Sequence, residues 1–275
     1  MNRTFINIII SVFFLFTYSL PVCAQNNLNT SLIGRWANGP CYAADVQGNY
    51  LYFGNGASLE IADIFDFSNP VRLGKILLPG LVKNIKVDEK YAYVTGTDFG
   101  LHIIDISDPN EPELMSETNI GLFSTELLIK DDYLFFANDY RGINIVNISN
   151  PNSPNETSTI DVTNSAKDIH FSNSDLFITS TRGLEIYDIS DLSNPKLISK
   201  THFEKIAYAQ RYTYHMAVQD SIVYLAGTAY GSHIMNVKDP VNPIEIGYIE
   251  LFSVFHLLFY IFYRNNGDHF GSQSV

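Results

Sequence analysis

The chain has 275 residues, of which 46% are hydrophobic, 13% aromatic and 17% charged, and its formal net charge is −12 at pH 7. So much apolar material with so few charges excludes an intrinsically disordered chain and predicts a packed globular protein. The acidic balance disfavours nucleic acid and anionic membranes as partners, because both would repel it.

Residues 1–24 have the organisation of a secretory signal peptide. Arg3 precedes an apolar stretch from Phe5 to Phe16, and the segment ends in Val22-Cys23-Ala24. We expect cleavage after Ala24, export to the periplasm, the cell surface or the medium, and no transmembrane span in the mature protein. Two alternatives stay open: an uncleaved anchor, which needs about 20 apolar residues, and a lipoprotein acylated at Cys23.

A unit of about 42 residues then recurs along the chain. Its marker is an apolar-Asp/Asn-apolar step before a proline turn, and successive copies end 42, 42, 41 and 48 residues apart. The copies are LEIADIFDFSNP ending at Pro70, LHIIDISDPNEP at Pro112, INIVNISNPNSP at Pro154, LEIYDISDLSNP at Pro195 and SHIMNVKDPVNP at Pro243.

Each copy divides into four short apolar-alternating runs separated by turn residues, with no helical period. Four antiparallel strands in about 42 residues are the size of a propeller blade. The sequence therefore predicts an all-β protein, a β-propeller with five recognisable repeats and a partial sixth.

The two ends of the repeat region differ from each other. SLIGRWANGP (Ser31 to Pro40) resembles VRLGKILLPG (Val71 to Gly80), the fourth strand of the first unit, so we expect this N-terminal strand to complete the last blade. After Ile249 no strand pattern follows. We assign residues 25–250 to the propeller and 251–275 to an irregular segment, either a truncated last blade or a degenerate natural one.

The copies GLHIIDISDP (Gly100 to Pro109) and GLEIYDIS (Gly183 to Ser190) resemble the third-strand pattern of the LVIVD-repeat family of exported bacterial proteins. The resemblance covers roughly Cys41 to Glu250, and the leader ending in CAQ is similar to those of exported Bacteroidetes proteins. It implies a β-propeller at the cell surface or in the envelope, without established catalytic residues. Asn147 and Asn236 depart from the aspartate of the pattern, which argues against a role that needs a full ring of carboxylates.

The repeated Asp and Asn residues are expected to shape turns. Short Asp and Asn side chains bond the backbone two residues on, and the members of this set are Asp63, Asp105, Asn147, Asp188 and Asn236. A calcium site at Asp66, Asp108 and Asp191 is disfavoured, since the alternating ligands and glycine of a calcium loop are missing. His102 and His233 occupy equivalent third-strand positions without further zinc ligands. We expect no metal, no cofactor and no catalytic residues.

A binding surface follows from the topology. If the first strand of each blade is innermost, the connections from second to third strand and from fourth to next first strand share one face, the loop face. The remaining connections share the opposite face, the turn face, which is acidic. The 48-residue interval places an insertion, within Thr201 to Met216, on the loop face, together with Phe99.

Tyrosine and arginine are enriched at binding hot spots, and function concentrates on loops of a rigid scaffold. We therefore predict that the loop face binds a protein or glycan ligand through Tyr140, Arg141, Arg182, Tyr208, Arg211, Tyr212 and Tyr230. The expected function is that of an exported, non-enzymatic binding or scaffold module. One alternative is a hydrolase or lyase acting on glycan or peptide at the channel mouth, which paired carboxylates or a His-carboxylate contact would favour. Another is a truncated product without function.

Overall fold

The computed structural model of the protein describes residues 39–249, except 97, 123, 139–140, 163–164, 181–182, 204–214 and 228–230. This part of the chain folds into twenty strands in five four-stranded sheets. None of its segments is a helix long and apolar enough to cross a bilayer.

Each sheet uses four consecutive strands. The first contains β1 (Ala44–Gln47), β2 (Tyr50–Gly54), β3 (Ser58–Asp63) and β4 (Val71–Leu77), and the second β5 (Val82–Asp88), β6 (Tyr91–Gly96), β7 (His102–Asp105) and β8 (Glu113–Glu117). The third contains β9 (Ser124–Lys130), β10 (Tyr133–Asn138), β11 (Gly142–Asn147) and β12 (Asn155–Ile160), and the fourth β13 (Ala166–Ser172), β14 (Asp175–Ser180), β15 (Gly183–Asp188) and β16 (Lys196–His202). The fifth contains β17 (His215–Gln219), β18 (Ile222–Gly227), β19 (Gly231–Asn236) and β20 (Ile244–Ile249).

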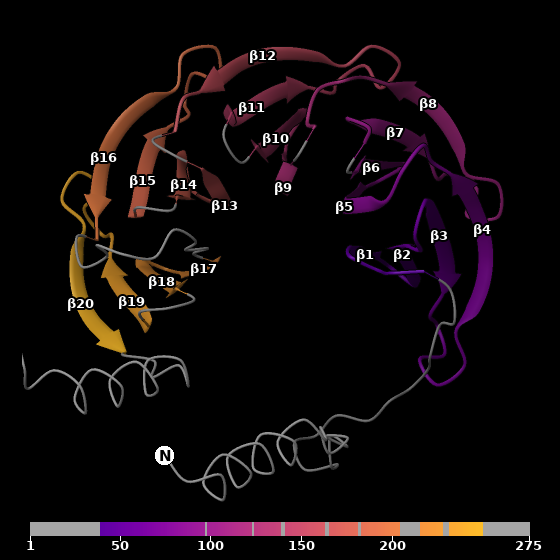
Figure 1. The fold of residues 1–275 in the computed structure, drawn as a ribbon, viewed down its shortest axis with the longest axis horizontal. Coiled ribbons are helices and arrows are strands. Elements are labelled where there is room, and N and C mark those ends of the chain that lie inside the picture. Colours follow the sequence, from indigo (N-terminus) through magenta and orange to yellow (C-terminus); the bar gives the residue numbers. More distant parts are fainter. Residues whose placement is uncertain are drawn as a thin grey trace, which may run out of the picture.

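The sheets follow one another around a common axis (Figure 1). The first strand of each sheet lies nearest the centre of the ring. There β5 contacts β1 and β9, and β13 contacts β9 and β17. The fourth strands form the rim. The predicted propeller of four-stranded blades with five recognisable repeats is confirmed, and so is the expectation that the first strand is innermost.

The core lies between neighbouring sheets. In each of the first four sheets, one face of the second strand carries an aromatic side chain, Tyr52, Tyr93, Phe135 or Phe177, which is at most 4% exposed and packs against the next sheet along the chain. Strands buried on both faces are apolar on both, which explains why the alternation in second strands such as YLFFAN is weak. Packing between consecutive sheets therefore stabilises the blades.

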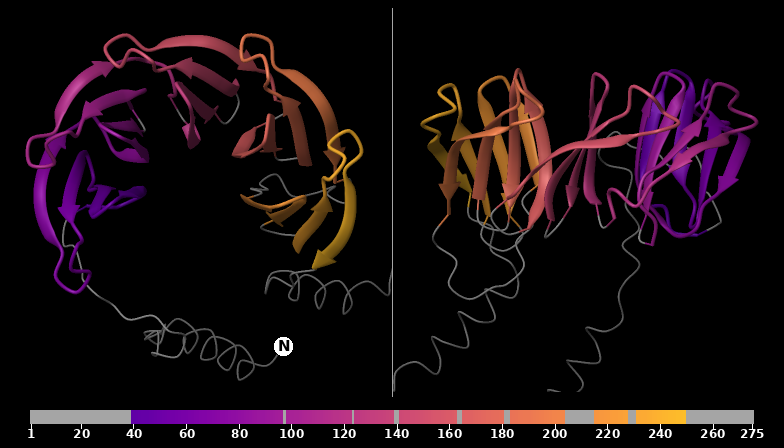
Figure 2. Two further views of the ribbon diagram at one scale, coloured as in Figure 1. Left: turned by 180° about the vertical axis from the view of Figure 1, so that it is seen from behind. Right: turned by 90° about the horizontal axis from the view of Figure 1, so that it is seen from above.

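The turn face is uniform. Every first-to-second strand connection has two residues, and the first of them adopts a left-handed φ of 49–60°: Gly48, Glu89, Asp131, Asn173 and Asp220. Every third-to-fourth connection has seven residues. Because neighbouring strands are antiparallel, these connections collect at one end of the ring (Figure 2).

The seven-residue turns confirm the role expected for the repeated Asp and Asn residues. The side-chain oxygens of Asp63, Asp105, Asn147, Asp188 and Asn236 accept the backbone N–H two residues on at 2.7–3.0 Å. A second residue in each turn does the same at 2.9–3.2 Å, namely Asp66, Asp108, Asn150, Asp191 and Asp239. A carboxylate oxygen and an amide oxygen both accept this backbone hydrogen bond, so asparagine can replace aspartate without loss of the turn.

The loop face is irregular. Its second-to-third strand connections have 3, 5, 3, 2 and 3 residues, and its links between sheets have 4, 6, 5 and 12 residues. The longest link precedes His215 and contains the predicted insertion. The predicted signal peptide at residues 1–24, the N-terminal strand up to residue 38 and the C-terminal segment 251–275 lie outside the described residues and stay predictions.

Candidate functional site

Polar side chains recur at one position of the first strands, near the loop face. Asn84, Glu126, Asp168 and His215 each pair with the equivalent residue of their second strand. Because the first strands surround the axis, these four residues lie around it near the loop face. We call Glu126, Asp168 and His215 the axial cluster.

Asp168 links the fourth and fifth sheets. Its Oδ2 accepts the backbone N–H of Met216 at 2.8 Å and lies 3.7 Å from Nδ1 of His215. The Asp168 side chain is 15% exposed, whereas that of His215 is 74% exposed. A carboxylate held by one main-chain bond thus faces an imidazole that solvent and a ligand can reach.

Glu126 on β9 has a raised pKa. Burial raises its pKa, and the charge of Asp168 raises it further, against smaller opposing effects of the Leu127 N–H, Lys86 and His215. Glu126 therefore holds a proton at a higher pH than an ordinary glutamate. The axial cluster can exchange protons and can bind a cationic or hydrogen-bond-donating group.

The equivalent Asn84 has a structural role. Its amide donates to Thr95 Oγ1 at 3.1 Å and to the main-chain and side-chain oxygens of Ser124 at 3.0 Å each. Thr125 Oγ1 donates in the same way to Ala166 O of the next sheet, at 3.3 Å. Polar groups near the loop-face ends of the first strands thus connect successive blades.

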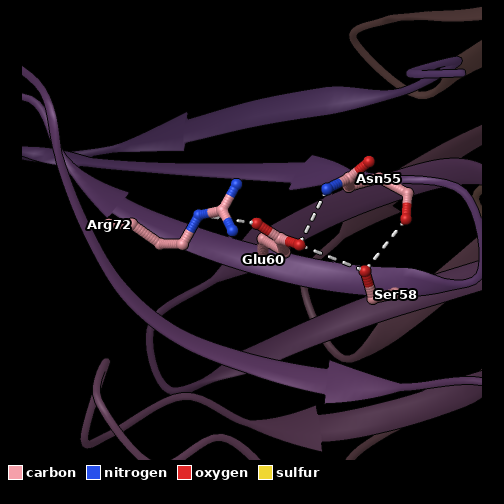
Figure 3. Close-up of polar contacts among 4 residues, drawn as sticks. All are labelled: Asn55, Ser58, Glu60 and Arg72. Atoms are coloured by element: carbon pink, nitrogen blue, oxygen red, sulfur yellow. Dashed lines mark hydrogen bonds and ion pairs between the residues drawn. The ribbon is translucent and has the colours of Figure 1, made fainter. Parts of the chain in front are cut away.

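A second repeated polar position lies on the third strands. Glu60, 2% exposed, accepts from Asn55 Nδ2 at 2.8 Å and lies 3.0 Å from Arg72 Nε, with Ser58 beside it (Figure 3). The other blades have corresponding pairs between third and fourth strands: His102 with Glu117, Asn144 with Glu156, Glu185 with Lys200, and His233 with Glu245. Each of these partners comes from the same blade, so we assign this position to blade stability.

His102 and His233 do occupy equivalent third-strand positions, as expected. His102 is 4% exposed, and its ring meets Phe99 edge-on at 4.8 Å. Burial lowers the pKa of His102, with the charge of Glu117 opposing. In the described part of the chain no group of three or more His, Cys, Asp or Glu side chains converges as a metal site would require.

Of the predicted binding residues, the structure describes Arg141. It is exposed and lies on the loop face, between β10 and β11, as expected. Tyr140, Arg182, Tyr208, Arg211, Tyr212 and Tyr230 lie outside the described residues. Their role in binding remains a prediction.

Phe99 is on the loop-face connection of the second sheet, but it is 5% exposed and packs in the core between the first two sheets. Gly96 leaves the space for its ring, since a Cβ there would lie 2.0 Å from a ring carbon. Phe99 therefore cannot contact a ligand as part of the surface.

The sequence did contain a signal for the axial cluster. Glu126 and Asp168 are separated by 42 residues, the length of the repeat, and Asn84 precedes Glu126 by the same interval. Aligning the first strands of the copies would have found them.

The comparisons with known proteins agree with this architecture. The LVIVD repeat matches residues 42–76, 79–119, 124–162 and 164–202, together more than half of the chain. The fifth sheet lies beyond the matched stretches, although its strands pair as in the other four. None of the curated proteins is significantly similar to the chain in sequence.

Solved structures with a similar fold include the β-propeller domain of Cps50 (Swd1) from Myceliophteria thermophila (TM-score 0.61, 11% identity, 78% of this chain and 75% of that one). Sqt1 from Saccharomyces cerevisiae has a TM-score of 0.63 at 9% identity over 79% of this chain and 63% of its own. The computationally designed Ika8 protein has a TM-score of 0.59 at 11% identity over 76% of this chain and 61% of its own. The chain thus spans less than two thirds of Sqt1 and Ika8, and these likenesses show the fold alone.

Proposed function

Because the chain belongs to the LVIVD-repeat family and folds as a β-propeller, we propose that it is an exported, non-enzymatic binding or scaffold protein whose loop face binds a protein or glycan ligand. The axial cluster and Arg141 form the described part of this binding surface. The unlike charges of Asp168 and Arg141 favour a ligand that carries both hydrogen-bond donors and acceptors.

The contrast between the two faces carries the proposal. All five blades keep connections of two and seven residues on the turn face, whereas connection length on the loop face varies from 2 to 12 residues. The short, uniform connections are sufficient to join the strands of a blade. Long insertions in surface loops cost little stability, so the fold tolerates them. Variation confined to one face is what a binding surface on a rigid scaffold requires.

The test compares the two faces of the mature chain. Binding to a glycan panel and to envelope proteins is measured for the wild type and for the triple variant Tyr208→Ala/Arg211→Ala/Tyr212→Ala. We expect the triple variant to weaken binding by about 2 kcal/mol or more with nearly unchanged thermal midpoint, the scale of an interface hot spot. Arg141→Ala is expected to weaken the same interaction.

The matched control changes exposed cations on the turn face, in Lys90→Ala/Lys238→Ala. This control should bind as the wild type does. Loss of binding in the control alone would move the site to the turn face. A triple variant that unfolds, while its residual folded fraction binds normally, would make the insertion a packing element.

Export is tested separately by cell fractionation and by the mass of the mature chain. Cleavage after Ala24 gives a chain that begins at Gln25. A chain retaining residues 1–24 would indicate an anchor, and an acyl group on Cys23 a lipoprotein.

The alternative is a hydrolase or lyase acting on glycan or peptide at the same end of the channel. The contact of Asp168 with His215 and the raised pKa of Glu126 favour it. It predicts that Asp168→Asn and Glu126→Gln abolish turnover of a glycan or peptide substrate while the substrate still binds. A wild-type protein that binds but never turns over its ligand excludes this alternative.

A further inference from the structure

The fifth sheet has one face that no other described sheet covers. Successive residues of a strand point to opposite faces, and Val223 and Leu225 of β18 pack against the fourth sheet. The opposite face consists of the three rows of paired residues that cross β17–β20 through Ala226, Tyr224 and Ile222. We call these rows the open face. It belongs to the last sheet of the described ring (Figure 1).

The open face carries exposed apolar side chains. Tyr224 is 43% exposed, Ile244 61% and Ile249 55%. Phe177 has the position of Tyr224 in the fourth sheet and is 2% exposed, because the fifth sheet covers it. The fifth sheet thus keeps large apolar residues on a face that is core in the sheet before it. Apolar patches of this kind mark interaction sites.

Charge indicates what can meet this face. The three rows, all of described residues, contain no Asp, Glu, Lys or Arg. The equivalent rows of the fourth sheet include Asp168, Asp175, Asp188 and Lys196. At a formal net charge of −12, two copies of the chain repel each other. The open face is a surface on which two copies can meet without bringing like charges together.

A second copy has two sheets at the ends of its ring that could meet the open face. On the first sheet, the residues that point away from the second sheet alternate with Tyr52 and Ile61 of the core. They include Phe53, Glu60 and Ala62, which are 6%, 2% and 0% exposed. A face that is already buried cannot receive another sheet, so a head-to-tail contact is excluded. Contact between two open faces gives a closed dimer with twofold symmetry.

We propose that the protein forms a dimer in which the open faces of two copies pack on each other. Tyr224 is in the middle row, so the two Tyr224 side chains lie near the twofold axis. Four strands of five or six residues, about 4.8 Å apart, give a face about 20 Å on each side. Interfaces of this size are at the small end of specific ones, so we expect the dimer to dissociate at micromolar concentrations.

Sedimentation velocity of the mature chain from about 1 µM to about 200 µM tests the dimer. We expect the monomer to convert to a dimer within this range. The dimer fraction should rise at high salt, because salt screens the repulsion between two acidic copies.

The test variant is Tyr224→Glu/Ile249→Glu. It should weaken dimerisation by about a hundredfold or more, since equal charges then face each other across the twofold axis. Leu114→Glu/Leu197→Glu, at exposed apolar residues of two other fourth strands, is the matched control and should dimerise as the wild type does.

Three results would overturn the proposal: a wild type that stays monomeric throughout the range, a test variant that dimerises as tightly as the wild type, and a series of species that continues beyond the dimer.

Crosslinking provides a measurement that does not require the charged variant to fold. Tyr224→Cys, in a Cys41→Ser background, should form a covalent dimer with a short bis-maleimide, whereas Leu197→Cys in the same background should not. A monomeric chain in which Tyr224→Cys does not react with the maleimide would show that the chain covers the open face itself, and would contradict the dimer. Ligand binding at the loop face enters neither measurement, so their outcome is independent of the proposed function.

Discussion

The buried ion pair of the fourth blade gives the sharpest stability prediction. Glu185 is 2% exposed, its Oε1 lies 2.9 Å from Lys200 Nζ, and its Oε2 accepts the hydroxyl of Tyr187 at 3.0 Å. Lys200→Met removes the ammonium and leaves a buried carboxylate. Breaking a buried pair from one side costs about 3–5 kcal/mol.

Two features of the site reduce that figure. The Tyr187 bond to the carboxylate remains and offsets roughly 1–2 kcal/mol, and Lys200 is 24% exposed, so water partly replaces it. We therefore expect Lys200→Met to lower the free energy of unfolding by about 2–3 kcal/mol. Glu185→Gln/Lys200→Met removes both charges and should recover to within about 1 kcal/mol of the wild type.

Urea-induced unfolding of the wild type, both single variants and the double variant measures this cycle. Lys196→Met, an exposed lysine at the start of the same strand, is the control and should change stability by less than about 0.5 kcal/mol. Additive costs in the double variant, or a cost of Lys200→Met equal to that of Lys196→Met, would refute the reasoning.

Three further predictions concern single positions. The pKa of Glu126 in the folded state is raised above 4.5, so the charged form of Glu126 destabilises the fold. This loss of folding stability grows as the pH rises through the raised pKa. Glu126→Gln should therefore increase the free energy of unfolding more at pH 7 than at pH 5 in urea titrations. Asn147→Ala should cost about 1 kcal/mol in thermal unfolding because it removes the turn bond, whereas Asn147→Asp should cost little. Gly142→Ala should lower the free energy of unfolding by more than about 2 kcal/mol, because φ is 75° and the new Cβ would lie 2.0 Å from Ile160 O. Gly48→Ala should cost about 1 kcal/mol, because φ is 60° there but the space is open. Equal losses in the two variants would contradict the steric argument.

The repeat made most of the fold predictable. Turns such as that of Asp188 are held by bonds to residues two positions on, so their chemistry is local and visible in the sequence. Blade-to-blade contacts between equivalent strands follow from the same period. The four strands of a unit and their order could therefore be predicted without any long-range information.

The candidate site was less accessible to sequence reasoning. Whether a loop residue points outward depends on packing partners far along the chain, and Phe99 shows this, because the space beside Gly96 directs its ring inward. The raised pKa of Glu126 arises from burial and from Asp168 in another blade. The residue types on the loop face predicted tyrosine and arginine as binding residues. They did not indicate the carboxyl and imidazole groups of the axial cluster.

The seven-residue turns also bear on how the chain reaches its fold. Each is closed by bonds within its own residues, and each joins strands that are adjacent in the sequence. Every blade therefore carries its own initiation point, with low contact order inside the blade, and the long-range contacts lie between neighbouring blades. Folding can start in any of the five and spread to its neighbours, and local opening of one blade can leave the distant blades intact.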